Sequence, residues 1–239
     1  MRFLIGPVAA VIFWTAGCDR KSGSPLETKT SEGQATEAPA GKAAARGDRA
    51  LVRFINADPR DKSSELWAGD TRLFTAIAYK DVSPYLEIPS QATQFRLREA
   101  NGTANLASIH DELFAGRSYT YVALPGKDSR TSLAELSDDL KPPKAGKARV
   151  RVINATRHLD NLELYRVGGK KGIGPRVRTG ASTDFKDVDP GTFEIRPANQ
   201  PPVEVLSNLV VDQDRFYTFV VLGSEGNLDV VRVEERLDR

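Results

Sequence analysis

Cysteine and histidine are almost absent from this sequence. The 239 residues contain one cysteine, one methionine and two histidines. A single cysteine excludes an internal disulfide framework, and so few thiol and imidazole groups exclude a zinc cluster built from them. A strong charge of one sign is also absent, because 34 basic and 32 acidic residues leave a net charge of +2. That balance supplies no extended field to attract nucleic acid, so we expect no nucleic-acid partner.

Long apolar runs are absent except for one short run at the N-terminus. Arg2 precedes the apolar residues 3–14, small residues follow, and the single cysteine, Cys18, comes next. The run is shorter than the roughly 20 apolar residues of a spanning helix. A charged start, an apolar centre and small residues before a cleavage point are typical of a secretory signal peptide.

The segment Thr15-Ala16-Gly17-Cys18 resembles the bacterial lipobox, which a dedicated peptidase cleaves before the cysteine. The resemblance implies that residues 1–17 are a lipoprotein signal peptide and that Cys18 carries acyl chains. Several acyl chains together hold a protein stably on a membrane. Thr15 replaces the usual leucine, which leaves an ordinary signal peptide with an incidental cysteine as the alternative. We expect a bacterial cell-envelope protein facing the periplasm or the exterior, and Asp19 resembles an inner-membrane retention signal.

Residues 18–49 have almost no large apolar side chains. Leu26 is the only large aliphatic residue among Ser, Thr, Gly, Ala, Pro, Lys and Glu. Such a segment buries too little apolar surface to offset the entropy of ordering. The sequence predicts a flexible tether.

The rest of the chain contains an internal repeat. Three blocks recur at a constant offset of 98 residues: 50–57 with 148–155, 95–98 with 193–196, and 117–124 with 215–222. Two copies with so long a period indicate a duplicated domain rather than a solenoid. We assign residues 50–136 to the first copy, 137–147 to a proline-containing linker and 148–239 to the second copy.

Each copy alternates apolar and polar residues, as Val52 and Phe54 do around Arg53. This period of two predicts half-buried strands, and turn residues separate the segments every 8–12 residues. We therefore expect an all-β protein with two tandem immunoglobulin-like β-sandwiches of about seven strands each. The repeated Tyr119 and Tyr217 resemble a tyrosine corner, which is a structural role.

The blocks 52–57 and 150–155 resemble the opening strand of a bacterial extracytoplasmic domain family that occurs in tandem on lipoproteins. Pro190-Gly191 and Tyr217-Thr218 fit the later motifs of that family, whereas Pro89-Ser90 departs from them. The resemblance covers residues 50–239 and implies an immunoglobulin-like sandwich with no assigned function or catalytic residue. A fainter resemblance is to the periplasmic adaptor of alginate O-acetylation.

Residues that could support catalysis or bind metal are scattered. His110 and His158 occupy non-equivalent points of the two copies, and no nucleophile motif accompanies them. Neighbouring side chains of an extended His110-Asp111-Glu112 would point to opposite faces. The carboxylate pairs 187/189 and 212/214 lack a full calcium-ligand set and suit turns better. We predict no enzyme activity, no cofactor and no metal site.

The two copies differ most in their loops, around 67–70 and around 168–175. The second of these loops is rich in glycine and contains Lys170 and Lys171, but it lacks the ending of a phosphate loop. Loops on rigid sandwiches commonly carry binding functions. We expect Lys170 and Lys171 to form a binding loop for an envelope protein or polysaccharide. The predicted function is a membrane-anchored binding or assembly module, and the alternative is an adaptor for exopolysaccharide modification such as O-acetylation.

The anchor prediction is tested by Cys18→Ser. Without its thiol the chain cannot be acylated, so the variant should be released from membranes or keep its signal peptide. Membrane fractionation and the mass of the mature protein measure both outcomes. Normal processing and membrane association of the variant would contradict lipidation.

Overall fold

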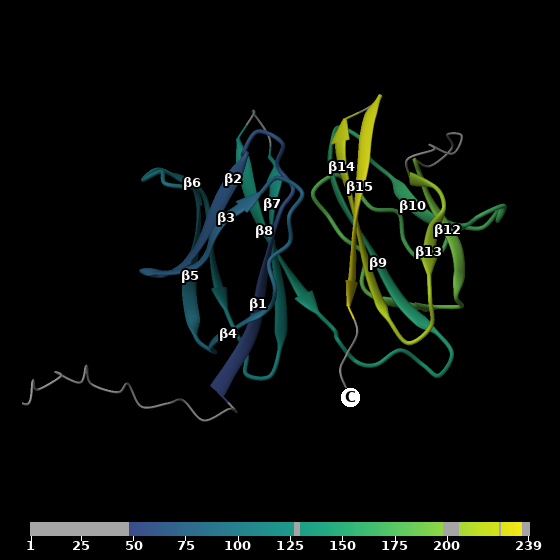
Figure 1. Ribbon diagram of the computed structural model, residues 1–239, viewed down its shortest axis with the longest axis horizontal. Helices are drawn as coiled ribbons and strands as arrows, with labels where there is room; N and C mark the ends of the chain where they lie inside the picture. Colours follow the sequence, from purple (N-terminus) through teal and green to yellow (C-terminus); the bar gives the residue numbers. More distant parts are fainter. Residues whose placement is uncertain (1–47, 127–129, 198–205, 225, 236–239) are drawn as a thin grey trace, which may run out of the picture. The chain divides into compact units, whose positions relative to one another are not determined.

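The computed structural model describes residues 48–126, 130–197, 206–224 and 226–235. All regular elements in these ranges are β-strands arranged as two immunoglobulin-like sandwiches (Figure 1), which confirms the predicted all-β class. These residues belong to one compact unit. No described helix is long and apolar enough to cross a membrane. The predicted signal peptide, Cys18 and nearly all of the tether lie outside the described ranges.

The first sandwich has two four-stranded sheets, in the orders β4-β1-β7-β8 and β3-β2-β5-β6. The strands are β1 (Arg49–Asn56), β2 (Ser63–Ala68), β3 (Thr71–Ala78), β4 (Leu86–Pro89), β5 (Ala92–Glu99), β6 (Asn105–Glu112), β7 (Ser118–Pro125) and β8 (Thr131–Asp138). The pair β1 and β7 is parallel, and the other pairs are antiparallel.

The second sandwich repeats this plan with the sheets β11-β9-β14-β15 and β10-β12-β13. Its strands are β9 (Ala148–Arg157), β10 (Leu162–Arg166), β11 (Lys186–Val188), β12 (Gly191–Pro197), β13 (Leu209–Val211), β14 (Phe216–Ser224) and β15 (Asn227–Glu235). The main difference lies beside β10. Where the first sandwich has β3, the described residues of the second make only the isolated bridges Leu162–Val177 and Tyr165–Gly172.

Repeated polar residues hold equivalent loops in both sandwiches. The buried Asn56 amide donates to the carbonyls of Asp61 and Ile77, and the buried Asn154 amide donates to those of Leu159 and Val177. These bonds explain why asparagine recurs at the end of the opening strand of each copy.

The repeated tyrosines also act as the sequence predicts. The hydroxyl of Tyr119 accepts a bond of 3.0 Å from the backbone N–H of Phe114, five residues upstream. Tyr217 accepts a bond of the same length from Asp212. Each tyrosine therefore fixes the corner before its own strand, as expected of a tyrosine corner.

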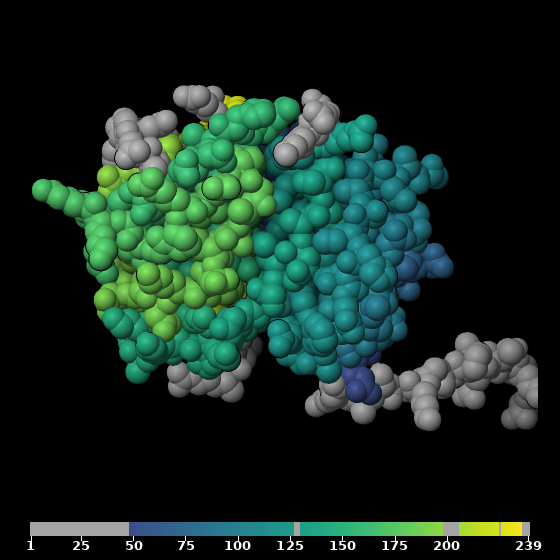
Figure 2. Space-filling model, turned by 180° about the vertical axis from the view of Figure 1, so that it is seen from behind, coloured from purple at the N-terminus to yellow at the C-terminus, as the bar shows by residue number. Residues whose placement is uncertain are grey.

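Each sandwich has its own apolar core, and a third cluster is shared by both. The buried members of the shared cluster are Ile55, Ala57, Val122, Leu124, Ile153, Ala155, Val220 and Leu222. Figure 2 shows the two sandwiches in contact along a seam. The prediction of half-buried strands is therefore wrong for β1, β7, β9 and β14. Both faces of these strands are buried, because their outer faces pack between the sandwiches.

A buried ion pair crosses the seam. The Arg151 guanidinium lies 2.6 Å from the carboxylate of Asp138, which ends β8 of the first sandwich, and the two side chains are 2% and 0% exposed. Arg151 also donates to Thr218 at 3.0 Å and lies over the Phe185 ring at 4.5 Å. A second residue of the first sandwich, Thr120, accepts from the same guanidinium at 3.2 Å.

Arg53 makes the matching contacts from the first sandwich. It pairs with Glu235, at the end of β15 in the second sandwich, and donates to Thr120 at 2.8 Å. Its guanidinium lies 4.7 Å from the centre of the Tyr85 ring. Burial raises the pKa of Tyr85, so its hydroxyl stays protonated and donates to Asp138 at 2.7 Å. The contacts are thus approximately two-fold, with one arginine from each sandwich reaching the last strand of the other.

Arg151→Met should reduce the free energy of unfolding by about 3–5 kcal/mol, because it leaves Asp138 buried without its cation. The control is Arg49→Met, since Arg49 pairs with Glu87 through side chains that are 31% and 63% exposed. An exposed pair of this kind contributes less than about 1 kcal/mol. Urea denaturation of both variants measures their free energies of unfolding. Equal decreases for the two variants would show that the buried pair across the seam stabilises the fold no more than an exposed pair does.

Candidate functional site

The predicted binding loop begins at the end of β10. Lys170 and Lys171 are exposed, and neither side chain has a hydrogen-bond or ion-pair partner among the described residues. The base of the loop is held, because Arg196 donates to the carbonyl of Gly169 at 2.7 Å. The two ammonium groups are therefore presented on a loop whose base is fixed.

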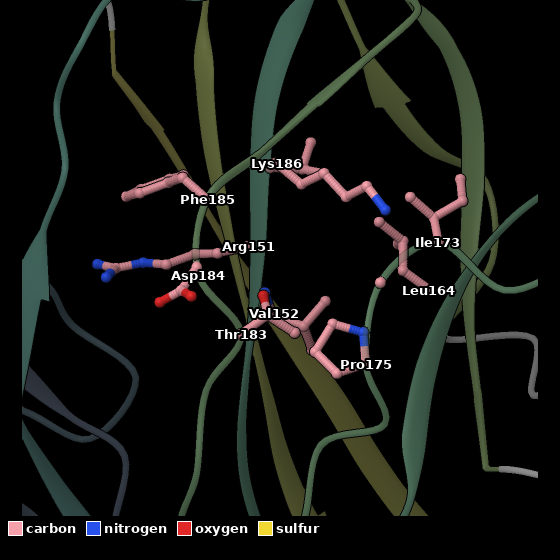
Figure 3. Close-up of a pocket in the computed structure, with 11 residues that line it drawn as sticks. Arg151, Val152, Leu164, Ile173, Pro175, Thr183, Asp184, Phe185 and Lys186 are labelled. Atoms are coloured by element: carbon pink, nitrogen blue, oxygen red, sulfur yellow. The ribbon is translucent and has the colours of Figure 1, made fainter.

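The segment after these lysines lines a cavity of about 200 Å³ at the edge of the second sandwich (Figure 3). Its walls are Val150, Arg151, Val152, Leu164, Ile173, Gly174, Pro175, Thr183, Asp184, Phe185 and Lys186. In Figure 3 the Lys186 amino group points toward Ile173 and Leu164. The cavity thus combines a largely apolar lining with an ammonium group at its side.

Comparison with the first sandwich explains the cavity. Arg72 lies opposite Trp67 in the first sandwich, and Gly172 lies opposite Tyr165 in the second. The residue numbers of equivalent positions in the two copies therefore differ by 98 before the loop and by 100 after it. The two extra residues lie in the stretch that contains Lys170 and Lys171.

With the offset of 100, Gly174 corresponds to Phe74, and with the offset of 98 Val152 corresponds to Phe54. Both phenylalanines are buried in the core of the first sandwich. The second sandwich therefore has a valine and a glycine in place of two aromatic rings. The space left by those rings accounts for the cavity.

An aromatic ring with paired charges lies on the outer face next to the loop. Tyr165 donates from its hydroxyl to Glu163 at 2.7 Å, and the Arg196 guanidinium lies 3.9 Å from the ring centre. The hydrogen bond to Glu163 raises the pKa of Tyr165. In the first sandwich, Trp67 and Arg98 make the equivalent stacked pair at 4.7 Å. This feature is common to both copies, so it does not distinguish the loop site.

The structure does not assemble His110, Asp187 or Asp189 into a site, whereas His158 lines a separate cavity of about 610 Å³. His110 is exposed on β6, while its neighbour Asp111 accepts a hydrogen bond of 2.6 Å from Tyr121. Asp189 pairs with Lys147 at 2.5 Å, and Asp187 lies 4.0 Å from Arg149. Among the described residues, no group of three or more His, Cys, Asp or Glu side chains could hold a metal ion.

One carboxyl group has an unusual environment. Glu135, on β8, has a buried side-chain oxygen without a hydrogen-bond partner. Burial raises the pKa of Glu135, and the negative charges of Asp111 and Asp138 raise it further. This group was not identified from the sequence, because an acidic residue within an alternating strand indicates a solvent-facing position.

Comparisons with known proteins give a family match and distant structural similarities. Residues 50–165 match the model of a domain of unknown function, DUF4397. No curated protein matches the sequence.

Three solved structures illustrate the distant similarities. The C-terminal domain of AlgF from P. aeruginosa is 23% identical over 38% of this chain and 99% of that one, with a TM-score of 0.31. A putative cell adhesion protein from Bacteroides uniformis is 11% identical over 80% and 99%, with a TM-score of 0.26. A family CBM26 module from Eubacterium rectale Amy13K, in complex with maltoheptaose, is 12% identical over 76% and 95%, with a TM-score of 0.23. Similarities this low transfer no ligand to this chain.

Glu135→Gln should raise the melting temperature at pH 7. A carboxyl group whose pKa is higher in the folded state stabilises the protein fully only below its unfolded pKa, about 4.5, and this contribution is lost as pH rises through the folded pKa. The advantage of the variant should therefore shrink as pH falls toward 4. Thermal unfolding between pH 4 and 8, with Glu112→Gln as an exposed control, measures this. A pH-independent effect of Glu135→Gln would contradict the assigned cause.

Proposed function

We propose that this protein is a non-enzymatic binding module of the bacterial cell envelope, held at the membrane by acyl chains on Cys18. The observation that supports this proposal most directly is the asymmetry between the copies. The second sandwich has a lysine-bearing insertion next to a cavity, where the first has the regular strand β3 and two buried phenylalanines. Lys170 and Lys171 are thus residues that the core does not need, on a loop that the first copy lacks, and such loops on rigid sandwiches commonly bind partners.

The character of this loop suggests the chemistry of its partner. Lys170 and Lys171 present two positive charges to solvent, and the cavity lining adds Lys186 together with one carboxylate, Asp184. The cavity wall is mainly apolar, through residues such as Ile173, Pro175 and Leu164. We infer an anionic envelope partner, such as an acidic polysaccharide, that places a small apolar group in the cavity.

Two variants of the full-length protein separate the loop charges from the cavity. Lys170→Ser/Lys171→Ser should weaken binding to an acidic envelope polysaccharide by about tenfold at low salt, because it removes two positive charges that have no ion-pair partner among the described residues. Val152→Phe should block the cavity with little loss of stability, since Phe54 occupies the equivalent position in the first sandwich. Binding isotherms and thermal unfolding measure the two effects.

The control for the lysine variant is Lys62→Ser/Lys141→Ser, which removes the same charge away from the loop. If this control weakens binding as much as the loop variant does, the effect is general electrostatics and the assigned site is wrong. Affinity capture from the native envelope then identifies the partner. Recovery of a polysaccharide acyltransferase would favour the adaptor role in exopolysaccharide modification over simple binding.

A further inference from the structure

A second cavity, of about 610 Å³, lies at one end of the seam between the sandwiches. Its lining comes from both copies: Pro125, Gly126 and Ser132 from the first, and Arg157, His158, Asp160, Arg178, Thr179 and Gly180 from the second. It shares no lining residue with the cavity beside the lysine loop. It is therefore a separate feature of the molecule.

The approximate two-fold relation places a counterpart at the other end of the seam. There Lys80 of the first sandwich forms an ion pair with Asp229 of the second, and Tyr79 packs against the shared apolar cluster. Lys80 donates its backbone N–H to the carbonyl of Asn56 at 2.8 Å, as Gly180 does to Asn154 at 2.8 Å. The backbone φ angles of Lys80 and Gly180 are +75° and +76°. Gly180 is thus the structural counterpart of Lys80.

The other two positions follow in the same way. Thr179 precedes Gly180 as Tyr79 precedes Lys80. In the β14–β15 hairpin of the second sandwich, Asp229 pairs with Leu222. Leu124 is the equivalent of Leu222, 98 residues earlier in the chain, and it pairs with Ser132 in the β7–β8 hairpin of the first sandwich. Ser132 is therefore the counterpart of Asp229. Three large or charged side chains at one end of the seam thus correspond to three smaller residues at the other: threonine for tyrosine, glycine for lysine and serine for aspartate. The smaller residues leave the space that forms the cavity.

The cavity left behind is rich in positive charge. Arg157 and Arg178 line it, and neither guanidinium has a hydrogen-bond or ion-pair partner among the described residues. Asp160 is the only carboxylate in its described lining, and one of its oxygens already accepts from the Thr179 N–H at 2.8 Å. Unpaired guanidinium groups facing one cavity suit a carboxylate or a phosphate, which arginine binds with two parallel hydrogen bonds.

We propose that this cavity binds an anionic sugar, through its carboxylate or phosphate at Arg157 and Arg178. The hydroxyls of Ser132 and Thr179 and the remaining oxygen of Asp160 provide partners for sugar hydroxyls. The volume lies within the roughly 300–1,000 Å³ of small-molecule sites. The site goes beyond the proposed function, since it needs neither the lysine loop nor the anchor.

Calorimetric titration of the full-length protein with glucuronate, glucose 6-phosphate and glucose tests this site. We expect saturable binding of at least one of the two anions and none of glucose, and comparing the anions distinguishes carboxylate from phosphate recognition. Arg178→Ala and Arg157→Ala should each weaken that binding at least tenfold. Arg117→Ala, at an exposed arginine outside the cavity, should leave it unchanged.

A second design rebuilds the symmetric ion pair. Ser132→Asp/Gly180→Lys restores the Asp229–Lys80 arrangement, and the backbone at 180 already has the conformation that Lys80 adopts. This variant should stay folded, as thermal unfolding will show, and should lose anion binding. Lys170→Ser/Lys171→Ser should keep it, which separates this site from the loop site. Failure of both anions to bind, or binding that survives both arginine variants and the rebuilt bridge, would overturn the proposal.

Discussion

The packing of the two sandwiches depends on the buried pair between Arg151 and Asp138. A buried guanidinium without a carboxylate is strongly destabilising, so the copies must meet where Asp138 reaches Arg151 and Glu235 reaches Arg53. The shared apolar cluster supplies contact area, but apolar surfaces tolerate sliding more readily than a hydrogen-bonded ion pair does. The ion pairs therefore fix the register of the seam, and with it the position of the cavity at its end.

The duplication separates what the fold requires from what it does not. Both copies keep the loop-holding asparagine, the corner tyrosine and the seam arginine. The asparagines and tyrosines bond to equivalent backbone groups, and each seam arginine pairs with a carboxylate at the end of the other sandwich's last strand. Both candidate sites lie where this equivalence fails. At one, Phe54 and Phe74 correspond to a valine and a glycine, and at the other the Lys80–Asp229 bridge has no counterpart. A stable two-fold frame tolerates such losses, because the remaining contacts of each copy still hold the loops.

The sequence predicted the strands and the tyrosine corners well. Strands depend on local periodicity, and each corner depends on a hydrogen bond between residues only five positions apart in the chain. It predicted the wrong environment for Arg53 and Arg151. An arginine between apolar residues indicates a solvent-facing position, and only the partner sheet reveals that this face is buried. The continuous apolar runs of β7 and β14, such as Phe219 to Leu222, indicate strands that are buried on both faces, and this indication was not used. The sequence placed Lys170 and Lys171 on a loop, and their role in binding stays a prediction. The cavity beside them depends on a change in the numbering offset between the copies that only strand pairing shows.

The two candidate sites also depend on both copies being present. The seam cavity takes Ser132 from the first sandwich, and the loop cavity includes Arg151, whose ion-pair partner Asp138 belongs to the first sandwich. Separated from its neighbour, the second sandwich would expose Ile153, Val220 and Leu222 and would leave Arg151 unpaired. The first copy, with its filled core and complete strand β3, therefore supports sites whose distinctive residues belong mostly to the second. The two copies therefore differ in kind: the first has the filled core, and the second supplies most of the lining of both cavities.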